Sequence, residues 1–479
     1  MNEIQILIHK IMKRNLTAFL TITFFLILSQ INAEVKLPAI FGDNMVLQQQ
    51  SDAAIWGTSA ANKTVKVTTS WDKKSYSTKA DSEGNWKLKV KTPSAGGPFS
   101  ITISDGKTLK LSNVLIGEVW VCSGQSNMQM IMNGYHNQPV LGSNEAIATS
   151  TNNSIRLITI EREKNLEAQQ DFSGEWLECI PENVANFSAT AYFFGKLVQK
   201  ALGVPVGLIS SSWGGTRIEP WMSESGIKKF DWVNLPDKNM EGVFTQQTPT
   251  VLFNAMISPM VGYAIKGGLW YQGESNRNEP QRYEKLMPGL IENWRAEWEI
   301  GDFAFYFCQI APYDYGTNGM NSAFLREAQF NASTAIPNIG MACLMDVGEK
   351  NNIHPADKKA AGERLAYLAL AKTYGQKGFE YSGPVLKEIK IEGSVVKLTF
   401  DHAKNGLTTF GKELVNFKIA GENKRFVPAS ATITREGISL VSPLVTSPVA
   451  VRYAFEDFVV GELFNNEGLP ASSFRTDDW

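Results

Sequence analysis

Length, composition and charge place the chain among folded proteins. Of its 479 residues, 43% are hydrophobic and 20% are charged, which supplies ample apolar material for a large core and excludes a disordered chain. The formal net charge is −2, and no cluster of Lys and Arg follows the N-terminal leader. Because nucleic-acid binding needs such clusters, we expect no nucleic-acid partner.

Residues 1–33 have the pattern of a secretory signal peptide. Lys10, Lys13 and Arg14 precede the apolar run LTAFLTITFFLILS, and small and polar residues follow up to Ala33. The run is shorter than the ~20 residues that a membrane-spanning helix needs, and no later segment is long and apolar enough. We predict cleavage after Ala33, export to the periplasm or the extracellular space, and no membrane span in the mature protein.

Residues 34–115 show a strand pattern interrupted by turns. Apolar and polar side chains alternate over residues 86–90 and again over residues 99–103, and Gly and Asp mark the turns between these segments. This alternation is typical of antiparallel strands with one buried face. The sequence therefore predicts a small β-sandwich, in which no chemistry is visible.

Residues 116–378 combine buried strands with amphipathic helices. Short apolar runs alternate with segments whose apolar residues recur every three or four positions, as over residues 187–202. This order predicts an α/β domain with a parallel, doubly wound sheet, whose ligands bind beyond the carboxyl ends of the strands. Over residues 379–479 the alternating pattern returns, which predicts a second β-rich module.

Four polar loops follow predicted strands of the α/β region. They are SGQSN with Ser126, SSWGGT with Gly214 and Gly215, QGESN from Gln272 to Asn276, and VGEKNNIHP with His354. Because the carboxyl ends of parallel strands share one edge of the sheet, we expect all four loops to meet in one crevice.

Ser126 and His354 are the candidate nucleophile and base. A serine hydroxyl is a weak nucleophile at neutral pH and needs a base to take its proton. Of the other histidines, His9 lies in the leader, His402 in the C-terminal module and His136 ten residues after the serine. The alternatives, a turn serine and a packed loop histidine, stay open from these residues alone.

Candidate donors for an oxyanion lie in the second and third loops. Gly214 and Gly215 lack a Cβ, so their backbone N–H groups can approach a bound substrate closely, although paired glycines also occur in ordinary turns. Gln272 and Asn276 offer side-chain amide donors. Met128 stands where the GxSxG elbow of α/β-hydrolases requires glycine, which disfavours that fold.

Several blocks in a fixed order carry a resemblance to a known family. They are LPAIFGDNMVLQQ, GQSNM, SSWGGTRIEPW, FNAMISPMVGYAIKGGLWYQGESNRNEPQRYEKLMPGLIENWR, GEKNNIHPADK and LFNNEGLPASSFRTDDW. These blocks resemble the sialate O-acetylesterase family, a branch of the SGNH-type hydrolases, over nearly the whole chain after residue 33. The resemblance implies a flavodoxin-like three-layer α/β/α hydrolase domain, no metal or organic cofactor, and removal of acetyl groups from carbohydrate hydroxyls. It also implies Ser126 as nucleophile, His354 as base, and oxyanion donors at Gly214 or Gly215 and within residues 272–276.

One departure concerns the group that orients His354. Many SGNH hydrolases have Asp three residues before the histidine, whereas this chain has Asn351, whose amide brings no charge. The orienting group is then Asp346, Asp357 or a backbone carbonyl, and Asp346 leads because strand-end residues line the crevice. We expect Glu274 to make an orienting hydrogen bond, since a carboxylate facing the oxyanion would oppose it.

The sequence leaves the substrate contacts and the substrate open. Gln125, Asn127 and Trp213 are candidate contacts beside the serine and glycine loops. Arg217 is a candidate partner for the carboxylate of a sialic acid, or for a nearby acid of the protein. Acetylated xylan or another plant polysaccharide is the alternative substrate, and an inactive carbohydrate-binding protein is the alternative from another class. The oligomeric state cannot be deduced.

The four cysteines are Cys122, Cys179, Cys308 and Cys343. In an exported protein they allow three disulfide connectivities, among which spacing cannot choose. Three of them lie in apolar, strand-like runs, which favours free, buried thiols. No Cys or His spacing suggests a metal site.

Overall fold

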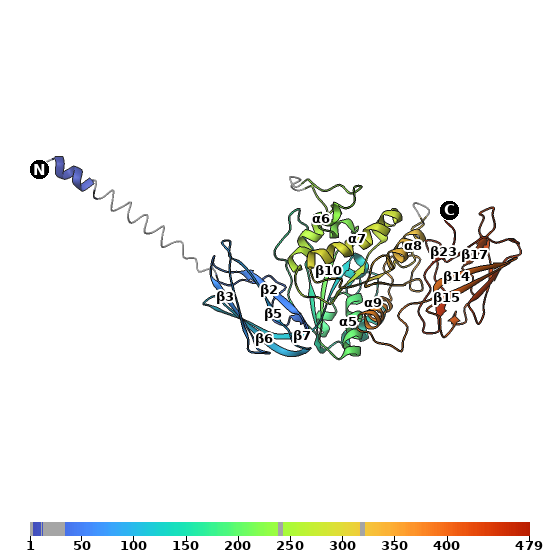
Figure 1. The fold of residues 1–479 in the computed structure, drawn as a ribbon, viewed down its shortest axis with the longest axis horizontal. Helices are drawn as coiled ribbons and strands as arrows, with labels where there is room; N and C mark the ends of the chain where they lie inside the picture. The colour runs from blue at the N-terminus through green and yellow to red at the C-terminus, as the bar shows by residue number, and fades with distance from the viewer. Residues whose placement is uncertain (1–2, 11, 13–33, 238–242, 317–320) are drawn as a thin grey trace.

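The computed structural model describes residues 3–10, 12, 34–237, 243–316 and 321–479. Most of the predicted signal peptide, including its apolar run, lies outside the described residues, so export stays a prediction. Within the described part, no helix combines the length and the apolarity needed to cross a bilayer. Figure 1 shows a blue N-terminal β module, a central α/β region and a red C-terminal β module in a row.

The central sheet confirms the predicted parallel arrangement. Its strand order is β13-β12-β11-β7-β10-β8-β9, and all neighbours run parallel except β8 and β9. The strands are β7 (Thr108–Gly124), β8 (Asn152–Thr159), β9 (Leu177–Cys179), β10 (Val206–Ser212), β11 (Gly267–Tyr271), β12 (Ala304–Cys308) and β13 (Ile339–Ala342). Since β7 has β10 on one side and β11 on the other, the carboxyl end of β7 lies at the centre of one sheet edge.

Helices cover both faces of this sheet. They include α5 (Ala189–Leu202), α7 (Pro280–Trp298), α8 (Ala323–Ala332) and α9 (Lys358–Leu368). Trp120 and Cys122 of β7 belong to the core beneath α5 and α9, whereas Val119 and Val121 belong to the core beneath α7 and α8. Successive residues of β7 thus enter opposite cores, because side chains alternate along a strand. The predicted three-layer α/β/α domain is confirmed.

The start of α5 is tied to the segment that follows β7. Ser188 caps the helix by accepting a hydrogen bond from the Ala191 N–H at 3.1 Å, as N-terminal serines do. Its hydroxyl also donates to the Met128 carbonyl at 2.6 Å. At the other end, Gly203 takes a left-handed conformation with φ 68°, which favours glycine. The cap therefore fixes the turn after β7 as well as the helix.

The N-terminal module is continuous with the central sheet. The first part of β7 pairs with β6 and the last part pairs with β10 and β11, so the predicted boundary at residue 115 falls inside one strand. The other strands are β1 (Val46–Gln48), β2 (Asp52–Thr58), β3 (Thr64–Thr69), β4 (Ser75–Lys79), β5 (Asn85–Lys91) and β6 (Gly96–Ser104). β2 and β5 form one sheet, and β3, β4 and β6 belong to the sheet that contains β7.

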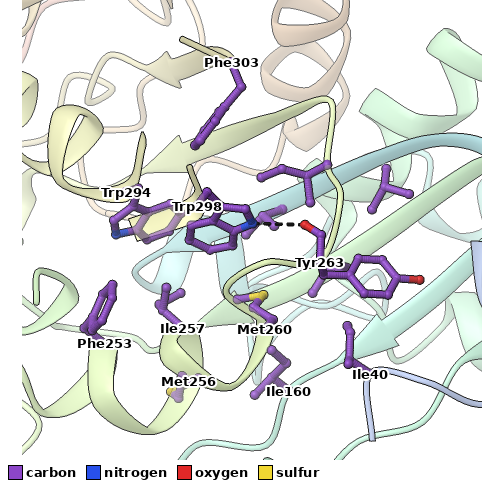
Figure 2. Close-up of a cluster of buried hydrophobic side chains, with 14 of the residues drawn as sticks. Ile40, Ile160, Phe253, Met256, Ile257, Met260, Tyr263, Trp294, Trp298 and Phe303 are labelled. Atoms are coloured by element: carbon purple, nitrogen blue, oxygen red, sulfur yellow. Dashed lines mark hydrogen bonds between the residues drawn. The ribbon is translucent and has the colours of Figure 1, made fainter. Parts of the chain in front are cut away.

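Apolar packing also holds the N-terminal module against the hydrolase domain. Figure 2 shows Ile40 of the N-terminal segment near Tyr263, with Trp298 of α7 in the same buried cluster. Trp298 Nε1–H donates to the Tyr263 carbonyl at 3.1 Å, and the Tyr263 hydroxyl donates to the Val46 carbonyl at 2.7 Å. Both polar ends of this aromatic pair are thereby satisfied inside the core.

The C-terminal region is β-rich, as predicted. Its two four-stranded sheets have the orders β14-β15-β20-β19 and β18-β17-β21-β23, and β16 pairs with β22. The strands are β14 (Val385–Glu392), β15 (Val395–Asp401), β16 (Leu407–Thr408), β17 (Phe417–Ala420), β18 (Val427–Pro428), β19 (Ser430–Ile433), β20 (Ile438–Val441), β21 (Ala450–Tyr453), β22 (Phe464–Asn465) and β23 (Phe474–Arg475). Their inner faces enclose a core of their own.

All four cysteines are free thiols, which confirms the favoured prediction. Cys122, Cys179 and Cys308 are buried, and Cys343 is partly buried. Burial raises the pKa of the Cys179 and Cys343 thiols to about 12, so both are protonated at neutral pH.

Candidate active site

The loops after β7, β10 and β11 start side by side at one edge of the sheet. Gly124 is the register partner of both Ser212 and Tyr271, so these three strands end at one level. Ser126 begins the short helix α2 (Ser126–Gln129) directly after β7. The loop that carries His354 comes from the edge strand β13 and reaches the same place, so the structure brings all four predicted loops together.

Ser126 and His354 are in direct contact. The serine Oγ lies 2.8 Å from the histidine Nε2, and both side chains are partly exposed, so a substrate can reach them. Asn352 accepts a hydrogen bond from the His354 backbone N–H at 3.0 Å and thereby shapes the loop. The pair has the geometry in which an imidazole can take a proton from a serine hydroxyl.

Gln138, and not Asp346, lies at the other ring nitrogen of His354. Gln138 Oε1 is 2.7 Å from Nδ1. Both carboxylate oxygens of Asp346 instead accept hydrogen bonds from Arg364, each at 2.7 Å, which corrects the expectation that Asp346 orients the histidine. The alternative, Asp357, caps α9 by accepting the Ala360 N–H at 2.9 Å. The position of Asp346 at a strand end did not reveal that its carboxylate is bound by Arg364.

His354 is held in its neutral form. Burial, and then the nearby Lys358 ammonium, lower the pKa of His354 to about 4. Lys358 is itself buried and donates to Asn127 Oδ1 at 2.5 Å; burial lowers the pKa of its ammonium to about 7. At neutral pH the imidazole therefore has one nitrogen with a free lone pair, and with Gln138 Oε1 accepting from Nδ1 that nitrogen is Nε2.

Asn127 and Glu274 form a buried support behind the serine. Asn127 Nδ2 donates to Glu274 Oε1 at 2.7 Å and to the Ile353 carbonyl at 3.1 Å, which joins three of the loops. Glu274, in η4 (Glu274–Asn276), is buried, and burial raises the pKa of its carboxyl group. Asn127 and Gln125 are only 1% and 3% exposed, so the expectation that they touch substrate is corrected: both are structural supports.

Gly214 lies against Ser126. A Cβ built on Gly214 would stand 3.2 Å from the Ser126 Cβ and 3.1 Å from Gln129 Oε1, which is tighter than side chains ordinarily pack. The Gly214 N–H donates to Gln129 Oε1 at 2.7 Å. The adjacent Gly215 is exposed and has a φ of 73°, a left-handed conformation that glycine adopts without strain. The glycine pair therefore permits close approach of backbone to the serine.

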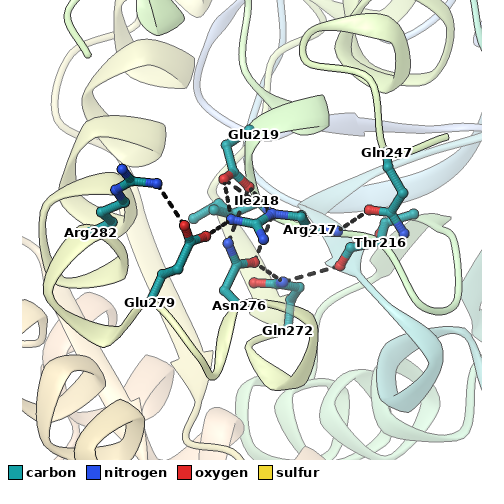
Figure 3. A network of polar contacts seen from close by, with 9 residues as sticks. All are labelled: Thr216, Arg217, Ile218, Glu219, Gln247, Gln272, Asn276, Glu279 and Arg282. Atoms are coloured by element: carbon teal, nitrogen blue, oxygen red, sulfur yellow. Dashed lines mark hydrogen bonds and ion pairs between the residues drawn. The ribbon is translucent and has the colours of Figure 1, made fainter. Parts of the chain in front are cut away.

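Gln272 and Asn276 take part in a hydrogen-bond network that connects loops (Figure 3). Gln272 Nε2 donates to the Thr216 carbonyl at 3.1 Å and to Asn276 Oδ1 at 2.7 Å. Asn276 Nδ2 donates to Glu219 Oε2 at 3.1 Å. Because both amides are buried, with exposures of 0% and 1%, the expectation that they donate to an oxyanion is corrected.

Arg217 belongs to the same network. It pairs with Glu219, where Nη2 lies 2.7 Å from Oε1, and with Glu279 (Figure 3). The interpretation that it binds a substrate carboxylate is thus corrected in favour of the protein's own acids.

Trp213 is partly exposed, with the Arg162 guanidinium 5.8 Å from the centre of its ring, and stays a candidate for stacking on a sugar.

A pocket of about 400 Å³ lies next to residues that contact Ser126 and His354, although neither of these two is among its lining residues. Gln129, Tyr135, Arg162 and Asn186 are among the residues that line it. Tyr135 packs edge-on against the imidazole of His354, with ring centroids 5.5 Å apart. The volume of the pocket lies within the range of small-molecule binding pockets.

Four residues of the site were not predicted. Gln129 follows Ser126 by three residues on the same helical turn, and Lys358 follows His354 by four in the block HPADK, so spacing offered a signal for both. Tyr135 and Gln138 offered none, because an ordinary loop contains such residues and only the folded structure brings this loop to the histidine.

Comparisons with known proteins agree with the fold. A profile of the family described as "Carbohydrate esterase, sialic acid-specific acetylesterase" matches residues 116–371. Human sialate O-acetylesterase is 30% identical over 463 residues, which cover 88% of this chain and 87% of the human protein. The rat sialate O-acetylesterase is 31% identical over 431 residues, or 76% of this chain and 78% of the rat protein.

A solved carbohydrate acetylesterase from Xanthomonas citri is 33% identical and has a TM-score of 0.85, covering 93% of this chain and all of that chain. The similarity therefore includes both β modules and not only the central domain. The profile match spans the sheet from the second half of β7 to α9 and includes both Ser126 and His354. The chain belongs to the sialic acid-specific acetylesterase family and is a carbohydrate esterase, a hydrolase of carboxylic esters.

Proposed function

We propose that the protein is an exported serine esterase that removes O-acetyl groups from sialic acids. The observation that carries the proposal is the 2.8 Å contact between Ser126 Oγ and His354 Nε2, both of which are partly exposed. The names of the mammalian relatives support sialate as the substrate. The order of basic, apolar and small residues within residues 1–33 supports export.

The first half of the reaction transfers the acetyl group to the enzyme. His354 Nε2 takes the proton of Ser126 Oγ as this oxygen attacks the acetyl carbonyl carbon. The backbone N–H groups of Ser126 and Gly215 donate to the oxyanion. The described residues show no acceptor for either group, whereas the N–H of the adjacent Gly214 donates to Gln129 Oε1. The sugar oxygen then leaves with the proton from His354.

The second half returns the enzyme to its starting state. Water loses a proton to His354 and attacks the acetyl group on Ser126. Acetic acid leaves as the bond to Oγ breaks, and the proton on Nε2 returns to the serine oxygen; the acid then ionises to acetate in water. Lys358 and Glu274 take no proton in this sequence; they hold Asn127, and through it the Ile353 carbonyl beside the histidine.

The rates of acetate release from an acetylated sialic acid and from acetylated xylan decide which of the two is the substrate. The mature chain is incubated with O-acetylated N-acetylneuraminic acid, with acetylated xylan and with 4-nitrophenyl acetate. We expect kcat/KM to be about tenfold or more higher for the sialic acid than for xylan, since substrate positioning contributes at least that much. Faster release from xylan would replace the substrate and keep the chemistry. No release from any of the three would indicate a carbohydrate-binding protein.

The pH profile tests the role of His354. A general base must be unprotonated, and the pKa of His354 is lowered to about 4, so activity is lost only as pH falls through that value. We expect kcat/KM for 4-nitrophenyl acetate to keep its plateau from neutral pH down to about pH 5 and to reach half-maximum near pH 4. Circular dichroism at each pH confirms that the enzyme stays folded. A half-maximum near the ordinary histidine value of 6.5 would contradict the burial argument.

A further inference from the structure

We propose that Gln138 is the residue that positions His354, holding the imidazole by Nδ1 as an aspartate does in a Ser-His-Asp triad. The inference deepens the proposed function and rests on it. It makes the site a serine and histidine completed by a neutral amide, with no acid in the third place. The 2.7 Å contact between Gln138 Oε1 and Nδ1 is its first support.

The backbone fixes the Gln138 side chain in this place. Tyr135 and Gln138 close a tight hairpin with reciprocal N–H to carbonyl bonds of 2.9 Å each. Three residues further on, the Leu141 N–H donates to the Ala356 carbonyl at 2.9 Å, and Ala356 lies in the loop that carries His354. The amide and the imidazole therefore belong to two segments that are joined to each other.

The acids near His354 are already used by other groups. Asp346 is paired with Arg364, and Asp357 caps α9. Glu349 accepts the Ala356 N–H at 2.7 Å and the side-chain amide of Asn352 at 3.2 Å, so it shapes the loop from within. None of these carboxylates has a hydrogen bond to Nδ1 in the described structure, and Gln138 does.

An amide in this position selects a tautomer without adding charge. With Oε1 facing the ring, the proton stays on Nδ1 and the lone pair of Nε2 faces Ser126 Oγ, as a general base requires. A carboxylate would select the same tautomer and would also stabilise the imidazolium that forms when the serine loses its proton. Glutamine therefore supplies orientation alone, which fits a histidine that stays neutral far below pH 6.5.

Other charged and titratable groups surround the imidazole. Lys358 approaches from α9, and Glu274 from η4 through Asn127. Glu349 lies in the histidine's own loop, Tyr135 packs on the ring, and Arg162 stands near Tyr135. Changing Gln138 leaves all of these in place, so a change in the titration of His354 reports on the third position itself.

Gln138→Glu and Gln138→Ala test the inference by kinetics. The new carboxylate adds an opposite charge beside Nδ1, so we expect the acid limb of kcat/KM for 4-nitrophenyl acetate to move up by about one to three pH units. Gln138→Ala releases the ring, and we expect kcat to fall about 10²-fold with KM nearly unchanged and no upward movement of the limb. His136→Gln, at an exposed position of the same hairpin, should match the wild type in both respects.

Nitrogen-15 NMR of the imidazoles gives a reading that needs no activity. Only four histidines exist, and His354→Gln removes one set of signals, so the His354 signals can be identified by difference. We expect protonated Nδ1 and bare Nε2 in the wild type, and a raised titration midpoint in Gln138→Glu. A Gln138→Glu profile that superimposes on the wild type, or a Gln138→Ala variant with kcat within about twofold, would overturn the inference. If the wild type hydrolyses no ester, the proposed function fails, while the NMR experiment still decides the position of Gln138.

Discussion

Replacing Ser126 by alanine lowers kcat for 4-nitrophenyl acetate by about 10⁴-fold or more and leaves the melting temperature within about 2 °C of the wild type. The change removes one partly exposed oxygen, so it creates no cavity in the core. His354 keeps its contact with Gln138, since that contact involves the other ring nitrogen. Initial rates and thermal unfolding of the two proteins provide the measurement.

Ser275→Ala is the matched control for this prediction. Ser275 is a partly exposed serine in the QGESN loop, beside the buried Glu274. Losing its hydroxyl should change kcat by less than about threefold, because surface substitutions away from reacting groups have small effects. A Ser126→Ala enzyme that keeps more than about one per cent of the wild-type rate would refute the assignment of the nucleophile.

The periodic parts of the fold were predictable because they depend on local pattern. Alternation over residues 86–90 and 99–103 indicated half-buried strands, and β5 and β6 lie there. Three-and-four spacing indicated the helix that became α5. The boundary at residue 115 was harder to place, because β7 continues through it with no turn signal and exchanges one set of neighbours for another.

The candidate site was predictable in its loops and less so in its contacts. Ser126 and His354 could be named because strand ends converge, a rule that needs only topology. The functions expected of Arg217 and Gln272 depended on which neighbours accept their hydrogen bonds. In the structure, Arg217 donates to Glu219, and Gln272 donates to the Thr216 carbonyl. Tertiary packing decides which partner each side chain finds, and the spacing of residues along the chain does not reveal that packing.

The C-terminal module is fastened to the hydrolase domain by a buried arginine. Arg326 of α8 is 0% exposed, and burial lowers the pKa of its guanidinium to about 10, so it is charged at neutral pH. Its Nε–H donates to Ser473 Oγ at 3.1 Å, and Nη1 and Nη2 donate to the Asp457 and Glu456 carbonyls. One side chain thus satisfies several buried acceptors of the module.

The same helix reaches the candidate site. One turn after Arg326, Gln329 Nε2 donates to the Gln272 carbonyl at 3.1 Å, and its Oε1 accepts the Ile310 N–H at 2.9 Å. Helix α8 therefore connects the C-terminal module with the loop that holds Glu274 behind the serine. A change that loosens α8 is expected to act on stability first and on activity second.

Arg326→Met should lower the free energy of unfolding by about 3–5 kcal/mol, because methionine fills much of the same space but leaves the Ser473 hydroxyl and the Asp457 and Glu456 carbonyls without their charged donor. Urea unfolding followed by fluorescence measures the loss. Arg282→Met is the control, since Arg282 is half exposed and pairs with the partly exposed Glu279, and its loss should cost less than about 1 kcal/mol. If both variants unfold at the same urea concentration, the buried arginine does not fasten the module. If Arg326→Met alone is destabilised and its kcat also falls, loss of the contact with the C-terminal module displaces α8 and, through it, the loop behind the serine.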